Sequence, residues 1–254
     1  MSASAFDSST VGFIAAHSEA VVRLVGEAIE PLGFITAASN GTMLCRLGDP
    51  DADLFAIYKP EVHERPLWDF PGALYLREVA AYEVSEFLGW GVVPPTVERD
   101  GPKGPGSVQL FVPHDPTRHY FELVEDPAWE RELARMAVFD MVTNNADRKG
   151  GHVLLSAATP RLYGIDNGLT FHVEPKLRTV IWDQAHVPFE GAWSDDLRRL
   201  HRCLAADEPF AERLHELLTI SEVTALAERA LQVSEMTAMP DIHPDDRWYP
   251  WPPI

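Results

Sequence analysis

The sequence predicts an α+β fold built in two lobes, because strand patterns dominate up to about residue 112 and helical patterns dominate after it. The chain has 254 residues, of which 46% are hydrophobic and 24% are charged, and this composition can bury a sizeable core. We therefore expect an N-terminal lobe (N-lobe) over residues 1–112 and a C-terminal lobe (C-lobe) over residues 113–254.

The predicted N-lobe combines short strands with two helices. Residues 17–30 carry apolar side chains at helical spacing after Ser18, and Pro31 is expected to end this helix. A second helix is expected over residues 73–88, ending at Gly89. Five strand patterns, separated by turns that contain glycine or proline, lie at about 33–38, 42–47, 53–59, 92–98 and 108–112.

The predicted C-lobe is mainly helical. Residues 128–142 have apolar side chains at helical spacing, and residues 194–238 contain patterns for two or three further helices. Two short apolar runs between these regions predict strands that border polar loops. The last stretch, residues 241–254, is rich in proline and tryptophan and is expected to be an extended tail that packs through its aromatic rings.

Composition argues against several classes of function. The net charge of −18, from 39 acidic and 21 basic residues, disfavours a surface that binds nucleic acid or an anionic membrane. No run of 18 apolar residues occurs, so no integral membrane association is expected. The polar first ten residues do not resemble a signal peptide, and Cys45 and Cys203 are the only cysteines, so we predict a cytoplasmic protein without a disulfide.

Two aspartates on consecutive loops, Asp147 and Asp166, carry the main functional signal. A kinase-type phosphotransferase uses one carboxylate to orient the attacking hydroxyl and a second to hold the Mg²⁺ that bridges the nucleotide phosphates. We predict that Asp147 is the catalytic carboxylate and that Asp166 is a metal ligand. Each also has a structural alternative, since Asp147 could cap its loop and Asp166 could form an Asx turn before Gly168.

His152 follows Asp147 at the position where a kinase-type loop supplies a second oxygen ligand to the metal. Imidazole suits Mn²⁺ or Zn²⁺ better than Mg²⁺. Either the metal preference is shifted towards Mn²⁺, or His152 is not a ligand. Asp140 falls on the apolar face of the helix before this loop, so we assign it a structural role.

Lys59 and Glu78 form a second predicted unit. Lys59 ends an apolar strand, where one compact positive charge could face phosphate oxygens. Glu78 lies among apolar neighbours on the next helix, and a carboxylate in such surroundings needs a partner. A strand lysine followed by a helix glutamate is the ion pair that positions the phosphate-binding lysine of kinases.

The turn between the first two strand patterns offers a third group of candidates. Its backbone N–H groups and hydroxyls could cover phosphates, although it lacks a GxGxxG pattern and can also be interpreted as a simple hairpin turn. The residues concerned are Ser39, Asn40, Gly41 and Thr42.

Six ordered stretches of the chain together resemble the phosphatidylinositol 3/4-kinase superfamily, in particular the type II phosphatidylinositol 4-kinases. The sequence is also similar to an uncharacterised actinobacterial family described only as kinase-like. The stretches are residues 56–60, 76–82, 106–112, 140–148, 165–171 and 182–189.

This resemblance implies a protein-kinase-like fold with ATP in the cleft between the lobes. It implies that Lys59 contacts the phosphates, that Asp147 is the base and that Asp166 binds Mg²⁺ or Mn²⁺. It further implies a hinge, whose backbone would bind adenine, formed by Gln109, Leu110, Phe111 and Val112.

The sequence departs from the family pattern at two places. His152 replaces the metal-binding asparagine, and the chain between Lys59 and Glu78 lacks the cysteine-rich insertion of the eukaryotic lipid kinases. Trp68 and Phe70 lie in that region, which could make peripheral contact with a membrane or a substrate, or could form a packed linker.

The predicted function is an ATP- and metal-dependent phosphotransferase that acts on a hydroxyl of a lipid, a polyol or a protein. The alternative from another class is a pseudokinase, which binds nucleotide without phosphoryl transfer. The feature that favours it is His152, together with the absence of a glycine-rich loop. Nucleotidyl transfer on the same fold is a third possibility.

Overall fold

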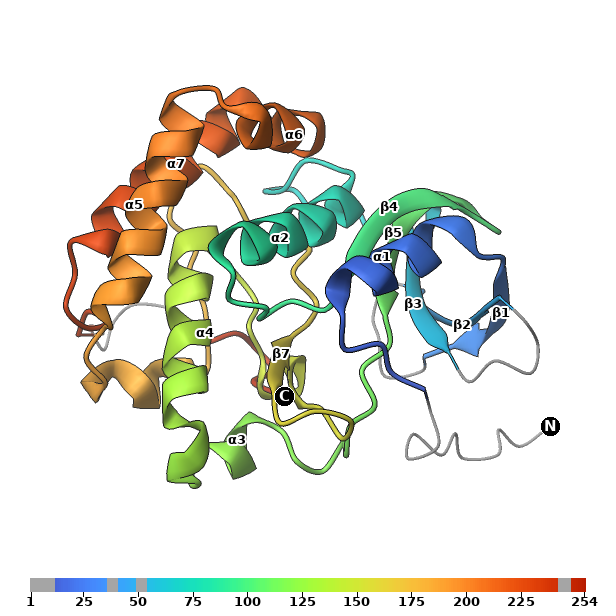
Figure 1. Cartoon of the computed structure of the whole chain (residues 1–254), viewed down its shortest axis with the longest axis horizontal. Helices are drawn as coiled ribbons and strands as arrows, with labels where there is room; N and C mark the ends of the chain where they lie inside the picture. Colours follow the sequence, from blue (N-terminus) through green and yellow to red (C-terminus); the bar gives the residue numbers. More distant parts are fainter. Residues whose placement is uncertain (1–11, 36–40, 49–53, 242–247) are drawn as a thin grey trace.

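The computed structural model describes residues 12–35, 41–48, 54–241 and 248–254, which form two lobes (Figure 1). A five-stranded sheet with α1 makes up most of the N-lobe, and helices make up most of the C-lobe. The predicted α+β fold in two lobes is therefore confirmed.

The N-lobe sheet is antiparallel throughout, with the strand order β1-β2-β3-β5-β4. Its helix α1 (His17–Gly26) buries Ala20 and Leu24 against the sheet, in one apolar cluster with Tyr58 and Val108. The strands are β1 (Ile29–Phe34), β2 (Met43–Leu47), β3 (Phe55–Pro60), β4 (Thr96–Gly101) and β5 (Gly104–Leu110).

Helix α2 (Leu74–Leu88) lies between the sheet and the helices of the C-lobe (Figure 1). The carboxylate of Glu64 accepts hydrogen bonds from the first two N–H groups of the helix, at 2.9 and 2.7 Å, and so acts as a cap from outside the helix. Gly89 ends it with a φ of 71°, a conformation that glycine adopts without strain. A short 3-10 helix, η2 (Glu61–His63), begins the segment that leads from β3 to α2.

The C-lobe is built around α4 (Glu130–Thr143). The buried face of this helix packs against α7 (Ile220–Ser234) and the 3-10 segment η5 (Ile181–His186). Helices α5 and α7 pack along each other beside it, so three helices occupy the region in which two or three were expected. The remaining elements are α3 (Tyr120–Leu123), η3 (Pro127–Trp129), α4 (Glu130–Thr143), η4 (Gly150–His152), β6 (Val153–Leu155), β7 (Leu162–Gly164), η5 (Ile181–His186), α5 (Gly191–Ala205), α6 (Pro209–Leu217) and α7 (Ile220–Ser234).

The first helix and the first strand differ from the prediction. Helix α1 ends at Gly26, and Pro31 lies inside β1 instead of ending the helix. Strand β1 is at the edge of the sheet, and its register shifts between Pro31 and Gly33. An edge position with an irregular register tolerates a residue that has no N–H to donate, so the strand begins earlier than its apolar pattern predicted.

The fourth strand, unlike the first, starts later than predicted. Val92 and Val93 donate their backbone N–H groups to the Ser85 hydroxyl of α2, at 2.9 and 3.2 Å, and therefore do not join the sheet. Sheet pairing of β4 begins at Thr96 and continues to a tight turn between Gly101 and Gly104.

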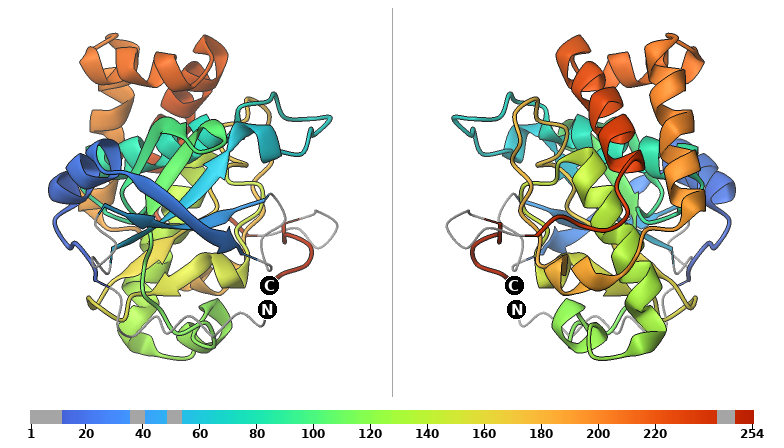
Figure 2. Two further views of the ribbon diagram at one scale, coloured as in Figure 1. Left: turned by 90° about the vertical axis from the view of Figure 1, so that its right-hand side faces the viewer. Right: turned by 90° about the vertical axis from the view of Figure 1, so that its left-hand side faces the viewer.

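The C-terminal tail packs through the ring of Trp248, whereas Tyr249 is 49% and Trp251 is 89% exposed, so the prediction that the tail packs through its aromatic rings is confirmed only in part. Trp248 meets Trp182 edge to face with ring centroids 5.4 Å apart. Its carbonyl oxygen accepts hydrogen bonds from Thr179 N–H at 3.0 Å and from the Trp182 ring N–H at 3.1 Å. Further along, the Pro253 carbonyl accepts the Gly150 N–H at 2.7 Å. Figure 2 shows this terminal segment in dark red, after α7.

The two cysteines are free and buried in different lobes, Cys45 on β2 and Cys203 on α5. Among the residues that the structure describes, no helix combines the length and the apolar character that a bilayer-spanning segment needs.

Candidate functional site

Three predicted site residues meet at the junction of the lobes. Lys59 Nζ lies 2.5 Å from Glu78 Oε1 and 2.8 Å from Asp166 Oδ1. Burial on its own lowers the pKa of Lys59, but the nearby charges of Asp166 and Glu78 outweigh burial and raise it. The lysine is therefore held as a cation, and its side chain remains 20% exposed at the site.

Glu78 connects α2 to the loop that carries Asp166. One carboxylate oxygen binds Lys59, and the other accepts the backbone N–H of Asn167 at 2.9 Å. Its side chain is only 4% exposed, and buried polar groups need hydrogen-bond partners. Both carboxylate oxygens of Glu78 have one. The position of α2 is thus fixed relative to the loop after β7.

Asp147 lies on the loop that follows α4. Asn144 ends that helix with a φ of 54°, and the Asn145 side chain accepts the Asp147 N–H at 2.9 Å. Burial raises the pKa of the Asp147 carboxyl, whereas the hydrogen bond from Lys149 lowers it. The charge of Asp166 raises it as well, so the two carboxylates are close enough to interact.

Lys149 is a residue of this loop to which the sequence analysis assigned no role. Its ammonium donates to Asp147 Oδ2 at 2.7 Å, so the loop presents a positive charge beside the predicted base. The available signal was a lysine two positions after the aspartate in a short polar loop, although sequence alone does not show where such a side chain points.

His152 and Asp166, the two predicted metal ligands, lie next to each other. His152 Nε2 lies 3.3 Å from Asp166 Oδ2, and burial lowers the pKa of the imidazole to about 4, so that it is neutral at physiological pH. Among the described residues no group of three His, Cys, Asp or Glu side chains could enclose an ion. A site with few protein ligands, in which water and phosphate oxygens complete the shell, is usual for a divalent cation at phosphates, and one carboxylate with one imidazole fits Mn²⁺ better than Mg²⁺.

The loop after β7 has an unusual backbone at Asp166, whose φ is 58°. This left-handed conformation is uncommon outside glycine, but aspartate and asparagine tolerate it. The loop is anchored on both sides, because Ile165 donates its N–H to the His152 carbonyl at 3.0 Å and Asn167 binds Glu78. Strain at a functional loop is typical where the surrounding structure fixes the geometry.

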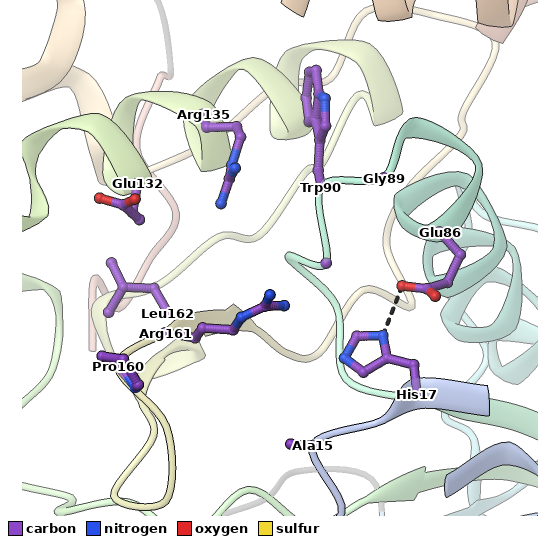
Figure 3. Close-up of a pocket in the computed structure, with 11 residues that line it drawn as sticks. Ala15, His17, Glu86, Gly89, Trp90, Glu132, Arg135, Pro160, Arg161 and Leu162 are labelled. Atoms are coloured by element: carbon purple, nitrogen blue, oxygen red, sulfur yellow. Dashed lines mark hydrogen bonds and ion pairs between the residues drawn. The ribbon is translucent and has the colours of Figure 1, made fainter. Parts of the chain in front are cut away.

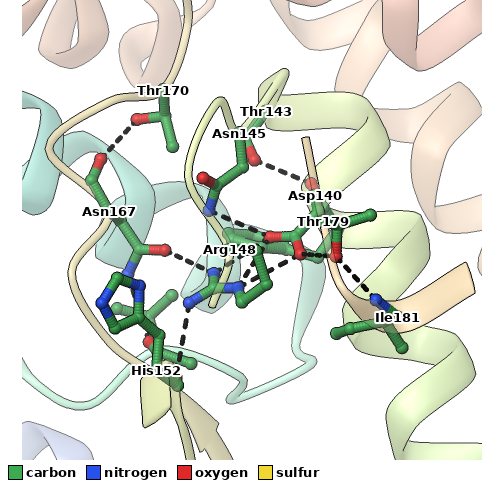
Figure 4. A network of polar contacts seen from close by, with 12 residues as sticks. Asp140, Thr143, Asn145, Arg148, His152, Asn167, Thr170, Thr179 and Ile181 are labelled. Atoms are coloured by element: carbon green, nitrogen blue, oxygen red, sulfur yellow. Dashed lines mark hydrogen bonds and ion pairs between the residues drawn. The ribbon is translucent and has the colours of Figure 1, made fainter. Parts of the chain in front are cut away.

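A buried ion pair lies between the loop of Asp147 and the loop of Asp166 and stabilises both (Figure 4). Asp140 and Arg148 are both fully buried, and Arg148 Nη2 lies 2.9 Å from Asp140 Oδ1. Arg148 also donates to the Ile165 carbonyl at 2.6 Å and to the Asn167 side chain at 2.7 Å. Burial raises the pKa of Asp140, against the lowering effect of Arg148. Asp140 thus has the structural role predicted for it, and Arg148 joins the loop of Asp147 to the loop of Asp166.

The predicted hinge lies where β5 leaves the sheet towards the C-lobe. Within it, Leu110 donates its N–H to Pro95 at 2.8 Å and Phe111 donates to Phe55 at 3.0 Å. The Gln109 side chain is buried and donates to Thr96 at 2.8 Å. These donors are engaged within the protein, so an adenine ring at this segment would have to use other backbone groups.

The predicted phosphate-covering turn is only partly visible. Ser39 and Asn40 lie outside the described residues. Gly41 has a φ of 61° and accepts a hydrogen bond from the His63 ring at 3.2 Å, while Thr42 is buried. Because β1 and β2 pair as antiparallel neighbours, the alternative interpretation as a hairpin connection agrees with the sheet.

The segment between η2 and α2 shows features of both proposed roles. Phe70 is buried with Leu74 and Ala146, as a packed linker requires. Trp68 is 95% exposed, with the Lys176 ammonium 5.8 Å from its ring centroid.

Comparison with known proteins identifies sequences similar to this chain. The family model described as "Phosphatidylinositol 3- and 4-kinase" matches residues 94–223. The protein named "Protein Rv2133c" from Mycobacterium tuberculosis (strain ATCC 25618 / H37Rv) is 39% identical over 255 residues, which cover 87% of this chain and 90% of the relative.

Solved structures support the fold. The structure of hydra Fam20 with sugar superposes with a TM-score of 0.55 at 17% identity, covering 89% of this chain and 89% of that one. The Golgi casein kinase gives a TM-score of 0.50 at 14% identity, covering 86% of this chain and 73% of that one. At these identities the likeness concerns the fold alone. The family match and the mycobacterial relative extend to the sequence itself, and they show that the chain belongs to the phosphatidylinositol 3- and 4-kinase family.

Proposed function

We propose that the protein is an ATP- and metal-dependent phosphotransferase that transfers a phosphoryl group to a hydroxyl. The observation that carries this proposal is the contact of Lys59 with Glu78 and Asp166 beside the loop of Asp147. Phosphoryl transfer requires mainly positioning and neutralisation of charge, and these residues supply a fixed cation, a metal ligand and a base.

Each residue has a defined task in this proposal. Lys59 would neutralise phosphate oxygens, and Glu78 holds its ammonium in place. Asp166 and His152 would hold a divalent cation, which would neutralise charge on the nucleotide phosphates. Asp147 would accept the proton of the acceptor hydroxyl. Burial raises the pKa of its carboxyl group, which makes the carboxylate a stronger base than it would be in water.

Replacing Asp147 by alanine should lower ATP turnover by about 10²- to 10⁴-fold, the usual contribution of a positioned general base. Turnover is measured with Mg²⁺ and with Mn²⁺. The matched control is Asp195→Ala, because Asp195 is 79% exposed on α5. If Asp147→Ala retained the turnover of the wild type, Asp147 would not be the base.

Replacing His152 by asparagine should shift the metal preference from Mn²⁺ towards Mg²⁺, because an amide oxygen replaces an imidazole nitrogen. We expect the affinity for Mn²⁺, measured by electron paramagnetic resonance, to fall by about tenfold. His186→Asn is the control, since His186 lies on the surface, where its ring contacts Glu130. Equal Mn²⁺ affinity in the wild type and His152→Asn would remove His152 from the metal site.

The pseudokinase alternative rests on the same histidine. Thermal stabilisation by ATP without transfer to any acceptor would favour it. Labelled ATP offered with phosphatidylinositol vesicles, free polyols and a cell extract would identify the acceptor class. The mass added to the product would distinguish phosphoryl transfer from nucleotidyl transfer.

A further inference from the structure

A second cavity, of about 450 Å³, lies at the junction of the lobes, away from the residues assigned to phosphoryl transfer. The N-lobe contributes the start of α1, and α2 contributes its C-terminal end with the turn that follows. The C-lobe contributes α4 and the hairpin between β6 and β7. Figure 3 shows that side chains from all four elements surround this space.

Two arginines from separate elements of the C-lobe point into the cavity (Figure 3). Arg135 comes from α4 and Arg161 from the hairpin between β6 and β7. In the described part of the chain neither guanidinium forms an ion pair, and the buried Arg135 Nε has no hydrogen-bond partner. Burial lowers the pKa of Arg135; the nearby charge of Glu132 raises it, and the charges of Arg131 and Arg161 lower it.

Carboxylates also border the cavity. Glu86 lies 2.7 Å from the ring of His17, and Glu132 lies 3.7 Å from Arg131. The charges of Glu132 and Glu190 act on Arg135, but among the described residues neither carboxylate lies within ion-pair distance of Arg135 or Arg161.

The turn after α2 brings the N-lobe close to one of these arginines. A Cβ at Gly91 would lie 3.0 Å from Arg161 Nη1, so the guanidinium rests against backbone that carries no side chain. Gly91 has a φ of 59°, a second reason why glycine suits this position. Arg161 thus reaches across the junction from the C-lobe to the N-lobe.

We propose that this cavity binds a small metabolite through an oxyanion, either a phosphate or a carboxylate, held between Arg135 and Arg161. Guanidinium groups match both oxyanions in geometry and charge, and the volume is that of a site for a small molecule. Arg135 is half-buried and its Nε has no hydrogen-bond partner, whereas Arg161 is exposed, so a bound oxyanion would supply an acceptor and a counter-charge mainly to Arg135.

The test uses two probes, inorganic phosphate and succinate, titrated into the full chain in chloride buffer by isothermal calorimetry. Arg161→Gln and Arg135→Gln are each expected to weaken the binding of at least one probe by about tenfold or more, since each removes hydrogen bonds to a charged group. The probe that binds more tightly identifies the oxyanion. Arg161 is exposed, so Arg161→Gln tests the site even if Arg135→Gln fails to fold.

Two controls separate this site from the rest of the molecule. Arg118→Gln and Arg202→Gln, each of which removes one charge from an exposed position, should leave binding unchanged. Lys59→Met, at the phosphotransfer site, should leave unchanged the binding that depends on Arg161. Binding that survives Arg161→Gln but disappears in Lys59→Met would overturn the proposal, as would equal losses in the charge control or no binding of either probe.

Discussion

Replacing Asp166 by asparagine is expected to lower phosphoryl transfer by at least about 10³-fold while the protein remains folded. The carboxylate contacts Lys59 at 2.8 Å and His152 at 3.3 Å, so it links the lysine proposed to bind phosphate to the other proposed metal ligand. Lys59 lowers the pKa of Asp166 below its usual value, which keeps it ionised and able to bind a cation. The amide of asparagine is uncharged, so it cannot form an ion pair with Lys59 or neutralise a bound cation.

Two measurements test this expectation. Turnover with labelled ATP reports the chemistry, and Mn²⁺ binding by electron paramagnetic resonance reports the metal separately. The Asp166 side chain is 44% exposed, so its loss should leave the melting temperature within a few degrees of the wild type. Asp195→Asn on α5 is the matched control. Normal Mn²⁺ affinity in Asp166→Asn would show that the metal, if used, binds elsewhere.

Replacing Arg148 by methionine is expected to lower the free energy of unfolding by about 3–5 kcal/mol. The substitution leaves Asp140 as a fully buried carboxylate without its cation. It also removes the donors to the Ile165 carbonyl and the Asn167 side chain. Denaturant unfolding measures the change, and Arg118→Met, at an exposed position, should alter stability by less than about 0.5 kcal/mol.

A double-mutant cycle separates the lost ion pair from the lost hydrogen bonds. Asp140→Asn removes the buried charge, so the double variant with Arg148→Met should lose less stability than the sum of the single variants. Strict additivity would mean that the cost lies in the hydrogen bonds to the two loops, and the explanation based on an unpaired buried charge would be wrong.

Much of the site could be predicted because its chemistry leaves local signals. Glu78 is an acid among apolar neighbours on a helix, and such a residue needs a cation, so its pairing with Lys59 could be inferred from their order in the chain. The α+β lobes followed from the change in apolar periodicity. The helix over residues 73–88 was predicted to within one residue, because glycine marks its end.

The errors arose where tertiary position decides local structure. Pro31 is compatible with β1 only because that strand is at the edge of the sheet, and sequence alone does not reveal an edge. The contact of Lys149 with Asp147 depends on the direction of a flexible side chain. The approach of Arg161 to Arg135 depends on how a hairpin packs against α4, which no pattern in the sequence encodes.

The contacts of Lys59 and Glu78 with the loop after β7 also bear on how the protein folds. Lys59 and Asp166 are 107 residues apart in the chain, and Glu78 and Asn167 are 89 residues apart. Contacts between such distant segments form slowly, because a long loop must close before they contribute any stability. Either lobe could collapse first without creating the site. A nucleotide that needs all of these groups would then bind only molecules in which both lobes have folded and docked, and nucleotide affinity could serve as a sensitive assay for the last step of folding.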